Sequence, residues 1–259
     1  MGGRVQRAKK TVEERIPALL VGPSHTMSCA LHSVWYEGPL HEWTTFEQDA
    51  TAEFQQHAWE RHNSTITIRP VGQLGPHNIA NVQLFIGDEK GLQGRFNQNV
   101  CHVMSAVFGS QGLNLRFGDF KSTNSTGRRI PDVVMMNQVH EVKVAGELKT
   151  QWVDQHNLND DPLQNYDTEE LLANWQDTCK TWGYPYGFYS TYHQHVFLKQ
   201  ELVAGHWSLR YSPIISGTMP HPSELTVRQC FFFLGKAAGR ADQIVNQTPP
   251  TDWVHVQNR

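Results

Sequence analysis

The stretch RIPDVVMM (129–136), followed by EVKVAGELKT (141–150), decides the fold that we expect. Both segments are short apolar runs rich in Val, typical of buried β-strands, and a tight turn between them predicts a hairpin. Asp132 opens the first strand. Glu147 and Lys149 lie near the end of the second, two positions apart and therefore on one side of it. Because the strands run in opposite directions, we expect two carboxylates and an ammonium at one edge of the sheet.

This trio has a clear chemical use. The carboxylates of Asp132 and Glu147, with the backbone carbonyl of Leu148, form part of an octahedral oxygen site suited to Mg²⁺ or Mn²⁺. A dication there would activate a water and neutralise charge on a phosphodiester. Lys149 would orient or deprotonate that water and stabilise the transition state. The alternative is structural: Asp132 would cap a turn, and Glu147 and Lys149 would form an exposed pair at a strand end.

The surrounding pattern predicts an α/β sheet flanked by helices. A segment with an apolar face at helical spacing (residues 91–112) precedes three strands, and a second helix with Thr168 as its N-cap follows them. The order is helix, three strands, helix, strand, which is typical of a sheet covered by helices. We expect the strands at 113–120, 130–137, 140–150, 186–192, 195–202 and 207–215, and the helices at 91–112, 168–183 and 223–240.

The rest of the chain is assigned by exclusion. Residues 1–87 are interpreted as an N-terminal extension packed on a core domain (88–245), and 246–259 as a loose tail. Within the extension, residues 1–15 are polar and of mixed charge, so we expect a frayed leader. The pattern then predicts a helix at 46–62 and strands at 64–71 and 81–87.

Charge and cysteine content exclude several classes of protein. The 259 residues include 22 Lys and Arg against 25 Asp and Glu, a net charge of −3, which excludes binding of nucleic acid by bulk positive charge. Four scattered cysteines with no CxxC pair argue against a zinc module or a disulfide framework. The longest apolar runs are far shorter than the ~20 residues of a membrane span. We therefore expect an intracellular protein, in cytoplasm or nucleus, with no membrane association.

A local basic groove remains compatible with this balance. Arg116, Lys121, Arg128 and Arg129 cluster around the loop that enters the Asp132 strand, and we expect them to line the mouth of the site and contact phosphates. A solvated basic loop is an equal alternative. The aromatic run from Trp182 to Tyr192 could stack bases, but alternating aromatics in a strand favour sheet packing.

The segment RIPDVVMM…VAGELKTQW resembles the PD-(D/E)XK restriction-endonuclease-like superfamily, whose core is a helix, three strands, a helix and a strand. It is most similar to an uncharacterised fungal branch with comparable PD and GELK phrases, and the resemblance covers roughly residues 90–215. Pro131 and Asp132 match the PD, and Glu147, Leu148 and Lys149 match the ExK. The resemblance implies a Mg²⁺-dependent phosphodiesterase, usually a nuclease, with Asp132 and Glu147 as ligands, Lys149 catalytic and nucleic acid as partner. It leaves DNA or RNA, and a homodimer, open.

Two departures from that family pattern keep a second function in view. Many members carry an acidic residue in the first core helix, but residues 92–108 have none; the nearest acid is Glu89, with Gln98 as a neutral substitute. A Gln-x-x-x-Tyr motif is often found on the second core helix, whereas here Gln176 is followed by Lys180. The alternative is a catalytically weak or inactive module of the same fold that binds nucleic acid or a protein partner.

Overall fold

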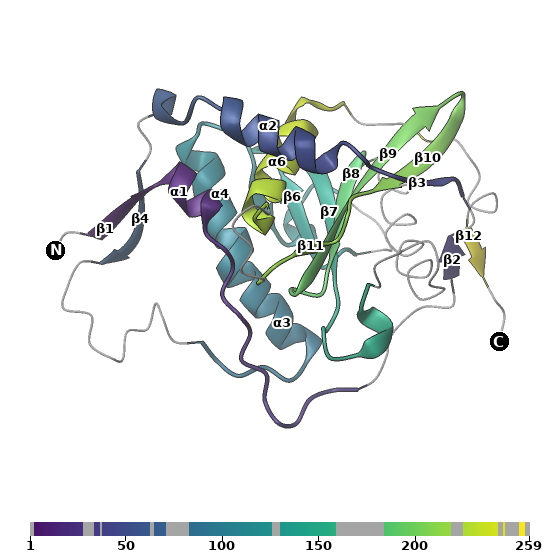
Figure 1. The fold of residues 1–259 in the computed structure, drawn as a ribbon, viewed down its shortest axis with the longest axis horizontal. Coiled ribbons are helices and arrows are strands. Elements are labelled where there is room, and N and C mark those ends of the chain that lie inside the picture. Colours follow the sequence, from purple (N-terminus) through teal and green to yellow (C-terminus); the bar gives the residue numbers. More distant parts are fainter. Residues whose placement is uncertain are drawn as a thin grey trace.

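A mixed β-sheet forms the centre of the molecule (Figure 1). The computed structural model describes residues 3–27, 34–36, 38–62, 65–70, 83–125, 130–158, 184–218, 225–242, 246 and 254–256. Within these residues the sheet has eight strands in the order β3-β10-β9-β8-β7-β6-β5, with β11 paired to β9. They are β3 (Leu40–Glu42), β5 (Arg116–Gly118), β6 (Val133–Met136), β7 (Val142–Leu148), β8 (Tyr186–Ser190), β9 (Gln194–Val203), β10 (His206–Tyr211) and β11 (Ile215–Ser216).

The predicted hairpin is confirmed, and so is the α/β class. β5, β6 and β7 are successive antiparallel neighbours, and β8 then pairs parallel to β7. A parallel pair needs a crossover connection rather than a hairpin. The helix that we expect in that connection, at 168–183, lies outside the described residues. The strand order is therefore compatible with the predicted series of three strands followed by a fourth.

A long helix with one irregular turn precedes the hairpin strands. It consists of α3 (Glu89–Phe96), a π-helical turn (Asn97–Cys101) and α4 (His102–Ser110). The side chain of Asp88 caps its start by accepting a hydrogen bond from the backbone N–H of Gly91 (2.7 Å). Leu92, Phe96, Val100 and Met104 along it are all buried.

Helices cover one face of the sheet, where the larger hydrophobic core lies (Figure 1). α2 (Phe46–Gln56) and α6 (Val227–Arg240) pack there beside α3 and α4. The sheet side of this core comes from alternate strand residues such as Met135, Val144 and Phe197, whereas their neighbours Val134, Ala145 and Leu198 point into a second core on the opposite face. This alternation is the two-residue period expected of strands buried on both faces.

The N-terminal leader is ordered, so its prediction as a frayed segment is wrong. β1 (Gly3–Arg7) pairs with β4 (Thr65–Pro70), and α1 (Ala8–Glu13) buries Ala8 and Val12. Thr226 donates a hydrogen bond to the carbonyl of Val12 (2.6 Å), and Arg228 donates one to that of Thr11 (3.1 Å). The burial of Ala8 and Val12 and these two hydrogen bonds hold the segment against the start of α6.

Two further expectations need correction. Ile86, in the predicted strand at 81–87, makes only an isolated parallel bridge to Val21. The predicted loose tail contains β12 (Val254–Val256), which pairs antiparallel with β2 (Val34–Tyr36). The N-terminal extension also contributes β3, which pairs with β10 at one end of the sheet. Among the described residues no helix is long and apolar enough to cross a membrane.

The absence of a side chain at Gly146 is a packing requirement that can be tested. A Cβ atom there would overlap the ring of Phe188, which is fully buried and lies 4.9 Å from the Phe231 ring centroid. Gly146→Ala should therefore lower the free energy of unfolding by about 1–3 kcal/mol, measured by urea denaturation. Gly94→Ala is the matched control: Gly94 is exposed on α3, a Cβ atom there meets nothing within 4 Å, and the change should stabilise by about 0.5–1 kcal/mol. Equal effects of both changes would contradict this packing.

Candidate functional site

The register of the hairpin brings Asp132 to the end of β7. Val133 lies opposite Gly146, so Asp132 and Glu147 occupy the next opposed positions, which share one face of the sheet. The Asp132 carboxylate accepts a hydrogen bond from the backbone N–H of Leu148 (2.8 Å). Asp132 is therefore fixed against the residue that separates Glu147 from Lys149.

Lys149 stands between two carboxylates. Its Nζ lies 3.2 Å from Oε1 of Glu147 and 3.5 Å from Oε2 of Glu89. Its backbone N–H donates to the carbonyl of Ser190 (3.0 Å), which continues the pairing of β7 with β8 beyond the strand end. Lys149 is buried, while the side chain of Glu89 is 43% exposed, so the cluster opens to solvent on the Glu89 side.

The first turns of α3 complete the site. Glu89 is the first residue of the helix, and the structure brings it to Lys149, as the sequence left open. One helical turn later, Gln93 donates from Nε2 to the backbone carbonyl of Asp132 (2.8 Å). Sequence reasoning missed Gln93; its signal is the four-residue spacing from Glu89, which places both on one helix face.

The electrostatics show crowded negative charge. Burial, and then the charge of Glu147, raise the pKa of Asp132 to about 7, although the Leu148 N–H and the Lys149 ammonium oppose the rise. Burial would lower the pKa of Lys149, but the carboxylates of Glu147, Glu89 and Asp132 outweigh it and raise that pKa above its ordinary value. The surrounding carboxylates therefore stabilise the ammonium of Lys149, whereas the charge of Glu147 destabilises the ionised form of Asp132.

The donor set suits a hard dication, although the side chains are not arranged around one. Three carboxylates converge on one ammonium, and oxygen ligands with surplus negative charge are what Mg²⁺ prefers. Among the described residues, however, no three His, Cys, Asp or Glu side chains are grouped closely enough to hold a metal ion. In the structure the Glu147 carboxylate pairs with Lys149. Metal binding would require that pair to loosen.

The other predicted site residues lie apart from this cluster. Gln98 accepts a hydrogen bond from Arg95, one turn along the helix. Arg116 lies opposite Met136, at the far end of β6 from Asp132, and the turn that contains Lys121 folds toward Met136 through Ser122. Because β5 runs antiparallel to β6, Arg116 lies at the opposite end of β6 from Asp132, and the expectation that these two cations line the mouth of the site stays a prediction. Gln176, Arg128 and Arg129 lie outside the described residues.

The aromatic strand residues are confirmed as packing residues. Tyr184, Phe188, Tyr189 and Tyr192 are all buried. His195 is also fully buried, with Nε2 3.1 Å from the carbonyl oxygen of Tyr192, and burial lowers its pKa to about 3. None of these rings is available to a base.

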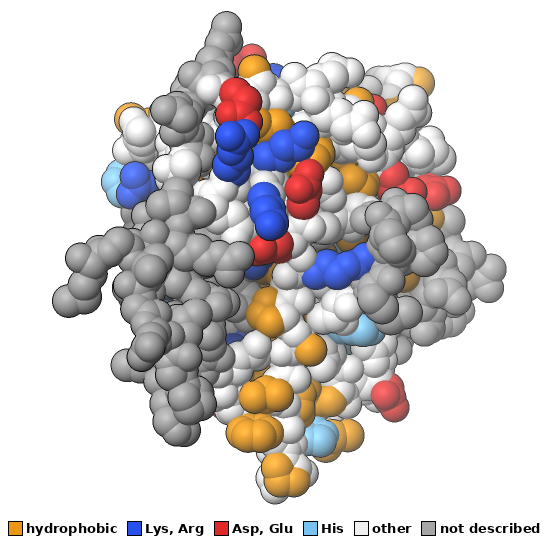
Figure 2. All heavy atoms as spheres, turned by 60° about the vertical axis from the view of Figure 1, so that its left-hand side comes forward, with side chains coloured by type: hydrophobic (Ala, Val, Ile, Leu, Met, Phe, Trp, Pro, Cys, Tyr) orange, Lys and Arg blue, Asp and Glu red, His pale blue; other side chains and the backbone are white. Residues whose placement is uncertain are grey.

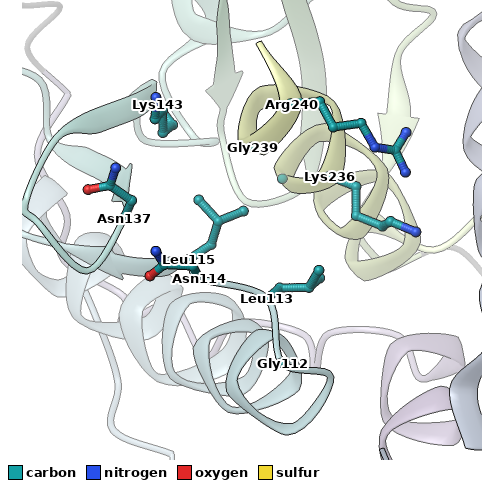
Figure 3. Close-up of a pocket in the computed structure, with 10 residues that line it drawn as sticks. Gly112, Leu113, Asn114, Leu115, Asn137, Lys143, Lys236, Gly239 and Arg240 are labelled. Carbon is teal, nitrogen blue, oxygen red and sulfur yellow. The ribbon is translucent and has the colours of Figure 1, made fainter. Parts of the chain in front are cut away.

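A cavity of about 300 Å³ lies elsewhere, between the end of α4, the β6–β7 turn and α6 (Figure 3). Lys143 at the start of β7 lines it, as do Lys236 and Arg240, whose side chains extend away from Lys143 and pair with Glu53. The turn residue Asn137 uses its amide on Glu141 (2.8 Å). Because its polar groups are occupied by the protein itself, this cavity is not the candidate site.

Comparison of the chain with protein-family models, curated proteins and solved structures finds no match. The likeness of the PD and GELK phrases to a nuclease superfamily therefore depends on residues of this chain alone.

The raised pKa of Asp132 predicts a pH-dependent stability in metal-free protein. The folded state holds this proton more tightly than the unfolded chain, whose Asp titrates near 4. The stability associated with the neutral carboxyl is therefore present below about pH 4 and lost as pH rises through about 7. Asp132→Asn stays neutral and keeps an acceptor for Leu148. Its free energy of unfolding in EDTA should match wild type at low pH and exceed it increasingly toward about pH 8.

Urea denaturation across this range, with the exposed Asp242→Asn as control, measures the effect. The control should follow the wild-type curve, because Asp242 is exposed at the end of α6. A constant difference between wild type and Asp132→Asn at every pH would contradict the burial of an ionised Asp132.

Proposed function

We propose that this chain is a metal-dependent nuclease that hydrolyses phosphodiester bonds of nucleic acid at a site built from Asp132, Glu147 and Lys149. The observation that carries the proposal is the convergence of their charges at one strand end, where Lys149 lies within 3.5 Å of two carboxylates and Asp132 is crowded by Glu147. A structural ion pair needs one carboxylate for one ammonium. The surplus of negative charge supports a site made for a cation.

The fold supports the proposal in two ways. The long helix, the three antiparallel strands and the parallel fourth strand follow the order of the superfamily that the PD and GELK phrases resemble. Glu89, the nearest acid to the segment 92–108 that contains none, is the first residue of the helix and supplies an acidic group to the site. The first departure from the family pattern therefore loses much of its weight.

The chain's own residues can be given distinct roles. Asp132, Glu147 and the Leu148 carbonyl would hold the metal, which when bound supplies an activated water and neutralises phosphate charge. Lys149 would donate hydrogen bonds to that water and to a phosphate oxygen, stabilising the charge that develops there. Gln93 holds the backbone of Asp132 in place through its 2.8 Å hydrogen bond. Glu89 keeps Lys149 near the strand end.

One observation favours the alternative, a module of this fold that binds nucleic acid or protein without cutting. In the described residues no three potential ligands are grouped for a metal, and Lys149 already neutralises Glu147. A stable Glu–Lys pair of this kind would keep the fold and remove the chemistry. The two functions differ in whether Mg²⁺ produces cleavage.

β7 contains its own matched control for the enzyme. A second Glu-x-Lys pair, Glu141 and Lys143, lies at its start, with Nζ 3.7 Å from Oε2, remote from Asp132. Glu147→Gln and Lys149→Ala should each reduce Mg²⁺-dependent cleavage of plasmid or single-stranded DNA by at least about a hundredfold. Glu141→Gln and Lys143→Ala should cleave at the wild-type rate. Initial rates on labelled DNA and RNA, with and without EDTA, make the measurement.

Two results would contradict the enzyme. Cleavage that persists unchanged in Glu147→Gln and Lys149→Ala would mean a contaminant or another site. Wild-type protein that binds oligonucleotide but shows no Mg²⁺- or Mn²⁺-dependent cleavage would favour the binding module.

A further inference from the structure

Exposed hydrophobic side chains gather on one side of the candidate site. Of the large hydrophobics that are exposed within the described residues, four lie on two short segments: Leu20, Met27, Leu84 and Phe85. We call these four side chains the apolar shelf. Figure 2 shows hydrophobic side chains at the bottom of this face, where Figure 1 places the chain before α3 and the segment that follows α1. Phe85 is 72% exposed.

Backbone hydrogen bonds join the two segments into one surface. The N–H of Ile86 donates to the carbonyl of Leu20 (2.9 Å), and the N–H of Thr26 donates to that of Gly87 (2.8 Å). Gly87 permits this approach, because a Cβ atom there would lie 2.7 Å from the carbonyl oxygen of Ser24. The shelf is thus held in place rather than carried on independent loops.

The shelf is connected to the candidate site in two ways, through Gly87 and through Trp152. Gly87 precedes Glu89 by two residues, and Trp152 follows Lys149 by three. The Trp152 indole donates to the carbonyl of Thr26 (2.8 Å), and its ring meets that of His25 edge-on at 5.4 Å. A strand whose phosphate lies at Lys149 would therefore place neighbouring nucleotides over these rings and the shelf.

The shelf carries no charge, which suits the faces of bases better than the outside of a duplex. Residues 16–27 and 83–87 contain no Lys, Arg, Asp or Glu. The outside of a duplex is phosphate, which proteins bind with cations. An unstacked base instead presents an apolar π-face that stacks on exposed aromatic side chains. We propose that the apolar shelf binds unpaired bases, so that single-stranded or frayed nucleic acid is the substrate class; this inference depends on the proposed function.

The size of the shelf also fits this occupant. A stable protein–protein interface involves roughly 20–30 residues on each side. The four side chains of the shelf are the apolar part of a smaller surface, which one or two stacked bases would cover. The shelf therefore commits to a nucleic-acid strand, and a protein partner becomes an outcome of the test.

The test compares one oligonucleotide as a single strand and as a duplex. Fluorescence anisotropy in Ca²⁺, which should support binding without cleavage, gives both affinities. Wild type should prefer the single strand, and Phe85→Ala should weaken single-strand binding about tenfold while leaving duplex binding unchanged. Phe85→Trp should restore the affinity. Leu202→Ala, an exposed hydrophobic side chain on β9, is the control and should have no effect. Thermal melting of each variant verifies the fold.

The outcomes separate this inference from the nuclease itself. Single-strand binding that depends on Phe85 without any Mg²⁺-dependent cleavage would support the shelf and sink the nuclease. Cleavage that depends on Glu147 but treats single strand and duplex alike, unaffected by Phe85→Ala, would overturn the shelf alone. No measurable single-strand binding, or Phe85→Ala changing only self-association in light scattering, would also overturn it.

Discussion

The partial burial of Asp132 at the junction of β6, β7 and α3 is the constraint that the site depends on. An ionised carboxylate loses hydration there, and among the residues that the structure describes the Leu148 N–H and the Lys149 ammonium compensate it. Both partners come from the residues just after Glu147, so the burial requires the hairpin to keep its register. A slip of one residue would turn Glu147 and Lys149 to the opposite face and leave Asp132 without its ammonium. The arrangement of the site therefore depends on the register of the hairpin.

Much of this arrangement could be predicted from local patterns. The two-residue period of a strand placed Glu147 and Lys149 on one side, and the antiparallel turn brought Asp132 to them. Helical periodicity predicted the long helix before the hairpin. The arrival of Glu89 and Gln93 could not be predicted in this way, because it depends on how α3 packs across the sheet. The order of the N-terminal segment was missed for a similar reason: the hydrogen bonds that hold α1 come from Thr226 and Arg228, over two hundred residues away.

The positions of the cations affect how a substrate strand would be held at the site. The sequence grouped Arg116 and Lys121 with Asp132 because they are close along the chain, yet antiparallel pairing carries Arg116 to the other end of β6. The described residues near Lys149 include the acidic Glu89, and the exposed hydrophobic side chains of the apolar shelf lie on segments next to it along the chain. Phosphate contacts would therefore contribute less to the binding of a strand here than the basic residues of the loop before Asp132 suggest.

The π-helical turn at Asn97–Cys101 has a geometric consequence for the two halves of the long helix. Leu92, Phe96, Val100 and Met104 are buried at intervals of four residues, although an α-helix rotates about 100° per residue and such a series should drift around its axis. A π turn holds an additional residue and takes up that drift. It therefore sets the rotation of α3, which presents Glu89 and Gln93 to the site, relative to α4, while both segments bury apolar side chains in the core. Loss of a single residue within this turn would leave α4 in its place in the core. It would rotate α3, and with it Glu89, away from the strand ends.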